Sequence, residues 1–190
     1  NGPIILTEKY IFPHSCKFPK DYLSFCLSKL PIFYETLLNK IIKKEKLVIQ
    51  HQQKYLSRYC PRLNTKLNGW IDWNIESLEL SRFIDAFDDP YIGASTMIND
   101  EKVTIKKAYL HSGDSSNHPF MAGMVSRHDT NWIVVSTKDK HMLLIREVLN
   151  KNNKNILSKI KVGDRFYTPH NKLDEAKKIR VKVTPFGTIK

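Results

Sequence analysis

The first residues of the chain alternate between apolar and polar positions. In GPIILTEKYIF, residues 2–12, the side chains of Leu6, Tyr10 and Phe12 fall on one side, and those of Thr7 and Lys9 fall on the other. A period of two residues is typical of a β-strand with one buried face. The pattern therefore predicts a strand at the N-terminus.

The next segment changes to a helical period. Between Asp21 and Lys46 the apolar residues recur at steps of three and four, which predicts an amphipathic helix with a kink or break at Pro31. The apolar face consists of Leu23, Leu27, Leu30, Tyr34, Leu37, Leu38 and Ile41.

A polar segment without periodicity separates this helix from a second one. Residues 50–69 contain Pro61 and end in Gly69, which predicts an extended connector. The pattern then predicts a helix over residues 75–87, with Asn74 as its N-cap. The helix is expected to end at Asp88-Asp89-Pro90, because a residue before proline disfavours the helical conformation.

Short strands follow at nearly regular spacing. The segments ASTMI, KVTIKKAYL, AGMVSR, WIVVST and HMLLIREV are bounded by turn residues such as Asn99-Asp100, and DRFYTP is a candidate sixth strand. Antiparallel strands of this length and spacing predict a small closed β-barrel, for which the OB type is a common solution. From His170 the tail is polar and basic, with a short helix predicted over residues 173–179.

The charge of the chain points to an acidic partner. The net charge is +12, and residues 151–190 carry eleven Lys or Arg against three carboxylates. Such a surface favours phosphate-bearing partners through counterion release. A chain with more Lys than Arg and abundant Asn and Ile could also owe its charge to an AT-rich genome.

Several classes of protein and site lack their sequence signals. No apolar run reaches the roughly 20 residues of a membrane-spanning helix, so we expect a cytoplasmic protein without a membrane partner. The seven histidines are scattered and the three cysteines form no CxxC pair, so no metal site is expected. Cys60 lacks an identifiable base, which makes a structural thiol the better interpretation than a nucleophile.

Two other groups of residues are candidates for function. Asp72, Asp88 and Asp89 lie close together in the sequence and could work as acids or metal ligands, but the Asp88-Asp89 pair before Pro90 is better explained as a cap and turn with its charge in solvent. Aromatic residues of the barrel region could stack on RNA bases, although such residues more often belong to the core. These aromatics are Trp132, Phe166 and Tyr167.

Four motifs carry a resemblance to a known family. PRLNTKLNGWIDWN, RFIDAFDDPYIGASTMINDEKVTIKKA, LLIREV and KVGDRF follow one another between residues 61 and 166. In their order and spacing they resemble the C-terminal half of the methionyl-tRNA formyltransferase-like family, which typically shows GRIDW, an NG-K-V-I-KA hairpin, LLI-EV and GDRF. Trp70 stands where that family usually has arginine.

The resemblance implies a fold class and a division of the chain. It implies an α+β fragment in which the last strand and helix of an α/β formyltransferase domain (residues 1–48) lead through a connector (49–73) to a C-terminal OB-like antiparallel β-barrel (74–168). A basic tail (169–190) follows.

The resemblance also implies where the chemistry lies. NGPIIL looks like the x-Gly and strand that follow the last active-site loop of the family's catalytic domain. The catalytic aspartate would then stand immediately before Asn1, with Gly2 as its loop neighbour. No catalytic residue is expected in this chain, which alone would be inactive. The cofactor, 10-formyltetrahydrofolate, would be bound by the missing N-terminal domain.

The acceptor remains open between alternatives. The family resemblance and the basic tail favour formylation of methionyl-tRNA, with Lys159, Lys161 and Arg165 as acceptor-binding residues. The alternative within the family is N-formylation of an amino-sugar nucleotide. The alternative of another class is a non-catalytic RNA-binding OB module.

Overall fold

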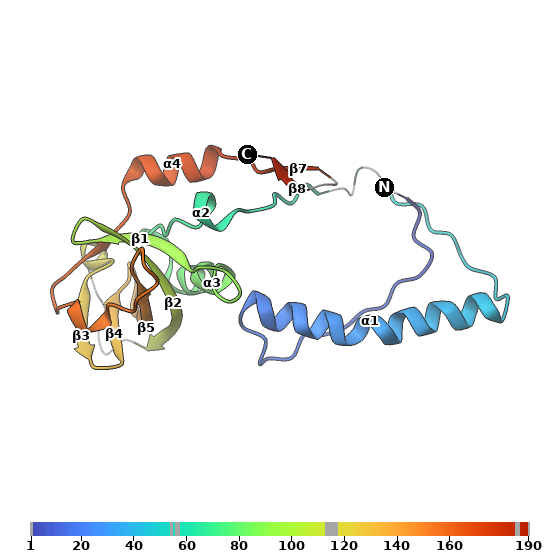
Figure 1. Cartoon of the computed structure of the whole chain (residues 1–190), viewed down its shortest axis with the longest axis horizontal. Coiled ribbons are helices and arrows are strands. Elements are labelled where there is room, and N and C mark those ends of the chain that lie inside the picture. The colour runs from blue at the N-terminus through green and yellow to red at the C-terminus, as the bar shows by residue number, and fades with distance from the viewer. Residues whose placement is uncertain (1, 54, 56–57, 113–117, 185–186, 190) are drawn as a thin grey trace. The chain divides into compact units, whose positions relative to one another are not determined.

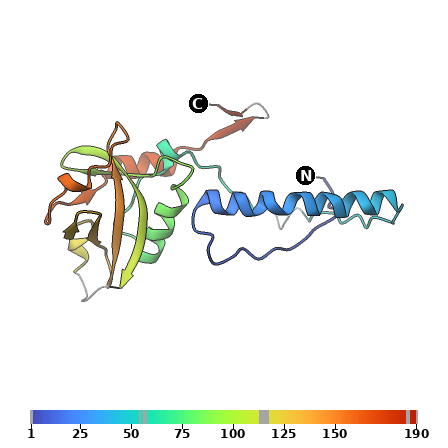
Figure 2. The ribbon, with the colours of Figure 1, turned by 60° about the horizontal axis from the view of Figure 1, so that its bottom comes forward.

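The chain divides by its internal contacts into two units, Asn1–Cys60 and Pro61–Lys190. The computed structural model describes residues 2–53, 55, 58–112, 118–184 and 187–189. The first unit contains one long helix, and the second contains a curled sheet with three shorter helices (Figures 1 and 2). The boundaries at residues 48, 73 and 168 stay predictions.

Helix α1 spans Pro19–Ile42 and confirms the predicted amphipathic helix. The Asp21 carboxylate accepts hydrogen bonds from the backbone N–H groups of Phe18 and Lys17, at 2.9 and 3.0 Å. These bonds lower the pKa of Asp21 and fix the first turn. The helix passes through Pro31 without interruption, so the predicted break is absent. A proline removes one N–H donor, and the 24-residue helix retains the bonds on both sides.

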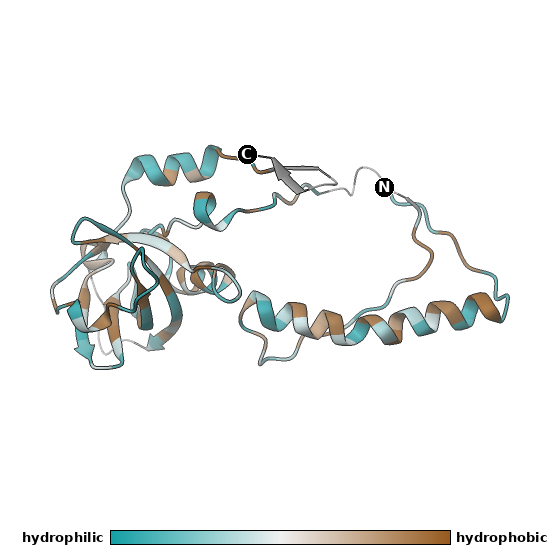
Figure 3. Ribbon diagram, in the orientation of Figure 1, coloured by the Kyte–Doolittle hydropathy of each residue, from teal (hydrophilic) through white to brown (hydrophobic). Residues whose placement is uncertain are grey.

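The apolar face of α1 is open. No residue of the helix is buried, and the hydrophobic stripe is visible along the ribbon in Figure 3. At the helix start, Phe12 packs edge-on against Tyr22, with ring centroids 5.0 Å apart. The more exposed members of the stripe are Leu23, Leu27, Tyr34, Leu38 and Ile41.

The strand predicted over residues 2–12 does not form. Only Ile4 pairs, in an antiparallel bridge to Gln50 with N–H···O distances of 2.9 and 2.8 Å. A strand requires a partner along its length. Among the described residues of this unit, the ladder partner is Gln50 alone, so the segment remains irregular.

Helix α3, Ser77–Ala86, confirms the second predicted helix with slightly narrower bounds. Its N-cap position is Glu76 rather than Asn74, and the Glu76 side chain makes no capping bond. Leu80 and Ile84 are fully buried and place the helix against the sheet. The helix packs on the second and fifth strands.

The sheet contains all six predicted strands. They are β1 (Ala94–Ile98), β2 (Glu101–Ser112), β3 (Val125–Asp129), β4 (Trp132–Ser136), β5 (His141–Leu149) and β6 (Phe166–Tyr167). Their order is β3-β4-β5-β2-β1-β6, and all neighbours are antiparallel. The structure is therefore an α+β fold whose six-stranded sheet curls into a half-barrel (Figure 2).

The two edge strands of this sheet approach each other at one end. An isolated antiparallel bridge joins Met124 to Arg165. Beside it, Val125 N–H donates to the Asp164 carbonyl and Phe166 N–H donates to the Gly123 carbonyl, both at 2.8 Å. The curl of the sheet is thus held by backbone hydrogen bonds.

The core of the sheet includes residues from the connector. Ile71 is fully buried, and Trp73 stacks on Phe166 with ring centroids 5.6 Å apart. The Trp73 indole N–H donates to the Thr96 hydroxyl at 3.0 Å. Phe166 has no exposed surface, so it is a core residue and not a platform for RNA bases.

Two short helices flank the sheet, followed by a hairpin. Helix α2 (Thr65–Asn68) lies in the predicted connector, and α4 (His170–Lys178) matches the helix predicted in the tail. The Asn68 side chain joins them by donating to the Ala176 carbonyl at 2.9 Å. The final strands β7 (Lys182–Thr184) and β8 (Gly187–Ile189) form a hairpin that the sequence pattern did not predict.

Candidate functional site

The aspartate pair after α3 builds a buried ionic cluster. Asp88 is fully buried, and its Oδ2 accepts from Lys107 N–H while Oδ1 accepts from Asp89 N–H, both at 2.7 Å. The pairing between β2 and β5 is interrupted at Lys107, whose φ is 52°, without a shift of register, and its N–H turns toward Asp88. The expectation that this turn keeps all its charge in solvent is therefore wrong for Asp88.

Lys106 supplies the cation of this cluster. Its Nζ lies 3.4 Å from Asp88 Oδ1 and donates to Asp89 Oδ1 and to the Tyr91 carbonyl, the latter at 3.0 Å. Burial alone would lower the pKa of Lys106, but Asp89 and Asp88 outweigh it and raise the pKa. The two carboxylates and the ammonium hold the turn between α3 and β1, which favours a structural role over acid–base catalysis.

Asp72 forms a separate local turn. Its Oδ1 accepts from Asn74 N–H at 3.0 Å, which shapes the approach to α3. The structure describes no hydrogen bond or ion pair between Asp72 and the Asp88–Asp89 cluster. The three aspartates therefore do not form one catalytic group.

A carboxylate that the sequence did not reveal caps α3 from another segment. Asp139 Oδ2 accepts from the backbone N–H and the hydroxyl of Ser77, at 2.9 and 2.8 Å. Its Oδ1 accepts from His141 N–H at 2.9 Å. Burial would raise the pKa of Asp139, but the hydrogen bonds from Ser77, His141 and Thr137 lower it to about 2. The cap links residues 62 positions apart, which local sequence patterns cannot show.

We expect Asp139 to make the second unit sensitive to acid. The ordinary carboxyl pKa of 3.8 applies to the unfolded chain and about 2 to the folded chain, so its stabilisation is present above pH 4 and is lost as pH falls toward 2. In urea unfolding, Asp139→Asn should lower the free energy of unfolding by about 2 kcal/mol at pH 7 and by much less at pH 2. Asp174→Asn, an exposed charge-matched control, should change neither value; equal losses at both pH values would contradict the cap.

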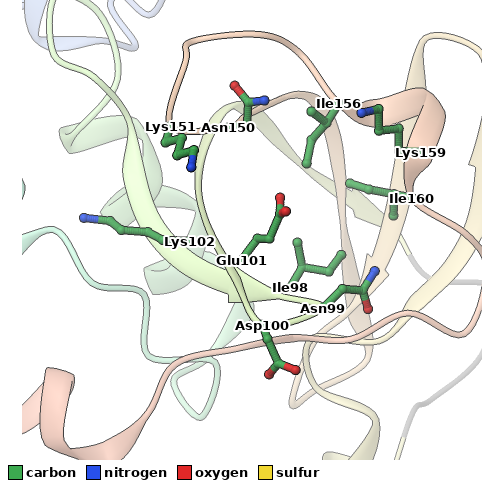
Figure 4. A pocket seen from close by; sticks show the side chains of 10 residues that line it. All are labelled: Ile98, Asn99, Asp100, Glu101, Lys102, Asn150, Lys151, Ile156, Lys159 and Ile160. Atoms are coloured by element: carbon green, nitrogen blue, oxygen red, sulfur yellow. The ribbon is translucent and has the colours of Figure 1, made fainter.

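A cavity of about 570 Å³ opens beside the turn between β1 and β2 (Figure 4). Its floor is apolar and its rim carries charged and amide side chains. The lining residues are Ile98, Asn99, Asp100, Glu101, Lys102, Asn150, Lys151, Ile156, Lys159 and Ile160. In Figure 4 the Glu101 side chain points toward the middle of the cavity, whereas Asp100 and Lys102 point outward.

The outer rim is electropositive. The Lys102 ammonium lies 4.6 Å from the centre of the Trp70 ring, although the residue as a whole is exposed. Burial of this group against its neighbours lowers the pKa of Lys102, and the charges of Lys172 and Lys66 lower it further. Lys66 of α2, Lys102 of β2 and Lys172 of α4 therefore lie close enough to contribute positive charge to the same part of the rim.

The structure places one of the three predicted acceptor-binding residues at the cavity and the other two outside it. Lys159 lines the cavity, whereas Lys161 and Arg165 do not. Arg165 instead lies over the exposed Phe120 ring, 4.5 Å from its centre. Sequence reasoning missed Lys102 as a neighbour of Lys159, although the Asn99-Asp100 turn signal already placed it at the start of a hairpin.

The N-terminal segment offers no ligand cradle by itself. Gly2 is exposed, and its carbonyl accepts from the Gln52 side chain at 2.8 Å. A Cβ atom at Gly2 would meet nothing within 4 Å. The space around Gly2 is therefore open among the described residues.

The histidines, cysteines and carboxylates of the described residues lie as follows. Within residues 2–53, 55, 58–112, 118–184 and 187–189, His, Cys, Asp and Glu form no group of three suited to a metal ion. The three cysteines are free thiols; Cys16 is partly buried, and Cys26 and Cys60 are exposed. None of the described helices combines the length and apolarity needed to cross a membrane.

Comparisons with known proteins identify the second unit. The family model described as formyl transferase, C-terminal domain, matches residues 64–160. Two structures of HypX from Aquifex aeolicus are also similar. A multiply substituted variant is 18% identical, with a TM-score of 0.44 over 63% of this chain and 19% of HypX.

The second HypX structure, described as a complex with tetrahydrofolic acid, is 15% identical, with a TM-score of 0.46 over 83% of this chain and 26% of HypX. The chain thus spans about a quarter or less of these proteins. The family model covers just over half of the chain and includes the end of the predicted connector with α2, then α3 and the five strands β1 to β5. The chain belongs to the formyl transferase family, whose C-terminal domain it contains.

Proposed function

We propose that this chain is the acceptor-holding part of a formyltransferase that uses 10-formyltetrahydrofolate. The match to the formyl transferase C-terminal domain is the observation that carries this proposal. In such a transfer, the acceptor amine attacks the formyl carbon and the folate nitrogen leaves. The groups that perform this chemistry belong, in our proposal, to a catalytic domain of which residues 1–48 form the end, with an aspartate immediately before Asn1.

The second unit would bind and orient the acceptor. We propose that its curled sheet is an OB-like barrel, with the domain occupying residues 74–168 and a basic tail at 169–190. Fixing the acceptor lowers the entropic barrier of a two-substrate reaction. This unit's contribution is therefore one of positioning, and the isolated chain should be inactive.

The acceptor that we propose is methionyl-tRNA. The net charge of +12 supports it, together with the exposed basic side chains of Lys159 and Lys161 and the partly exposed Arg165. The second candidate, an amino-sugar nucleotide, is supported by the cavity of about 570 Å³, because pockets of 300–1,000 Å³ suit ligands of nucleotide size.

Binding of initiator tRNA tests this proposal directly. We expect the 190-residue chain to bind the tRNA and to lose affinity steeply as salt rises, because each phosphate contact releases counterions. Lys159→Glu and Lys161→Glu should each weaken binding by about 3- to 10-fold and reduce the salt slope by about one unit. Lys43→Glu, at the end of α1, is the charge-matched control and should have a smaller effect.

The outcome distinguishes the candidates. No tRNA binding at low salt would exclude tRNA as acceptor and would also exclude the RNA-binding module. In that case, formyl transfer to an amino-sugar nucleotide by the protein with its catalytic domain would support the second candidate. Transfer to neither acceptor would overturn the proposed function.

A further inference from the structure

The cavity beside the β1–β2 turn has one wall built by a tight hairpin. Asn99 and Asp100 both adopt positive φ, 48° and 62°, which is the geometry of a two-residue type I′ turn. The turn pairs Ile98 with Glu101, so both side chains project from the same face of the hairpin. The wall thereby presents an apolar base with a carboxylate above it.

The opposite wall is held by hydrogen bonds from asparagine side chains. Asn150 Oδ1 accepts from the N–H groups of Asn152 and Lys154, at 2.9 and 3.0 Å. Asn155 Oδ1 accepts from the N–H groups of Val148 and Leu157, both at 3.2 Å. These bonds fix the path from β5 to the short 3-10 helix Leu157–Lys159, so the wall is organised before a ligand arrives.

Two lysines and one carboxylate face this preformed space. Lys151 and Lys159 come from the wall after β5, and Figure 4 shows Glu101 between them. The structure describes no ion pair of 4 Å or less for either lysine among residues 2–53, 55, 58–112, 118–184 and 187–189. Asp100 does not neutralise them, because it points outward and accepts from the Tyr167 hydroxyl at 2.8 Å.

The floor of the cavity adds an apolar surface to these charged groups. Ile98, Ile156 and Ile160 are nearly or fully buried in the core, yet each contributes surface to the cavity. Apolar C–H faces of a sugar ring can pack on such a surface, while its hydroxyl groups donate to a carboxylate. Phosphate oxygens would meet the two lysines.

We propose that this cavity binds a sugar-phosphate group, with Lys151 and Lys159 on the phosphate, Glu101 on a sugar hydroxyl, and the three isoleucines under the ring. This proposal adds detail to the acceptor-holding role proposed above. It rests on that proposed function, because only that function makes the sugar-phosphate group a part of the acceptor. Two sources share this chemistry: the backbone of an RNA and the head of a nucleotide-linked sugar. The charge from Lys102 and its lysine neighbours at the rim increases the attraction for either.

Titration calorimetry on the 190-residue chain tests the phosphate contacts, with uridine diphosphate and uridine diphosphate glucose as probes. Lys151→Glu and Lys159→Glu should each lower the affinity for both probes at least 10-fold. Lys154→Glu makes the same charge change in the same loop but does not line the cavity, so it should lower the affinity less than 3-fold. Equal losses in all three variants would show general charge attraction and overturn the proposal.

The same titrations test the carboxylate. The chain should bind uridine diphosphate glucose more tightly than uridine diphosphate, because only the former offers glucose hydroxyls to Glu101. Glu101→Ala should remove this preference while leaving or raising the affinity for uridine diphosphate. A preference retained in Glu101→Ala would overturn the role of Glu101.

Competition with an initiator tRNA transcript identifies the source. If the tRNA displaces the glucose nucleotide and loses affinity in Lys151→Glu, the site serves RNA; if it does neither, the site serves the free nucleotide. If neither probe depended on Lys151 or Lys159 while the chain still bound tRNA elsewhere, the cavity proposal would be overturned and the proposed function would stand. If the cavity bound the nucleotide but the protein with its catalytic domain transferred no formyl group, the proposed function would be overturned and the cavity proposal would stand.

Discussion

Replacing Asp88 by alanine is expected to lower the free energy of unfolding of the second unit by about 3–5 kcal/mol, since the change breaks a buried ion pair by removing one partner. Asp88 is fully buried and accepts from the N–H groups of Lys107 and Asp89. Alanine would leave both donors without this acceptor and would remove one of the carboxylates near Lys106. Urea unfolding monitored by fluorescence of the buried Trp73 measures the loss.

Two further variants separate the contributions. Asp89→Ala should be milder, because the Asp89 side chain is 47% exposed and the Lys107 N–H stays bonded to Asp88. Adding Lys106→Met to Asp88→Ala should lower the stability further, because in the single variant Lys106 still donates to Asp89 and to the Tyr91 carbonyl. A loss below about 1 kcal/mol for Asp88→Ala would contradict the structural role of the cluster.

Gly123→Ala is expected to destabilise the second unit by about 3 kcal/mol or more. Gly123 has a φ of 82°, which disfavours a residue with a Cβ by roughly 1–2 kcal/mol. In addition, a Cβ here would lie 2.1 Å from the Phe166 carbonyl oxygen, which belongs to the backbone and cannot rotate away. The resulting shift would strain the bond from Phe166 N–H to the Gly123 carbonyl, so the edge strands would separate. Thermal unfolding of the variant provides the measurement.

Gly163→Ala is a matched control for this prediction. Gly163 also has a positive φ, 93°, but a Cβ there would meet nothing within 4 Å. Its expected loss is therefore the backbone contribution alone, roughly 1–2 kcal/mol. If the two variants lost equal stability, the close approach of Gly123 to Phe166 would have no energetic role.

The strands could be predicted from the sequence because their signals are local. Alternating residues and turn pairs such as Asn99-Asp100 predicted β1 to β6, and the structure contains all six, although the β7–β8 hairpin was not predicted and the strand predicted over residues 2–12 does not form. The resemblance carried by the motifs was likewise confirmed by the family match, which covers residues 64–160 and stops before KVGDRF. Local pattern and motif order were sufficient for this part of the fold.

The features that depend on distant partners were not predictable in this way. Asp88 looks like a solvent-exposed turn residue until the positive φ of Lys107 turns a backbone N–H toward it. Asp139 looks like an ordinary loop residue until Ser77 of α3 lies beside it. The cavity likewise joins the β1–β2 turn to residues fifty positions later. The N-terminal strand failed for the related reason that a strand pattern does not guarantee a neighbour.

The bonding between Met124 and Arg165 has a consequence for how the domain behaves at high concentration. An open edge strand offers rows of free N–H and C=O groups to any passing chain and can seed fibrils or exchange of strands between molecules. Here Val125 at the start of β3 bonds to Asp164, just before β6, and Phe166 at the start of β6 bonds to Gly123, just before β3. The curl of the sheet therefore also shields this end of both edges from intermolecular strand addition.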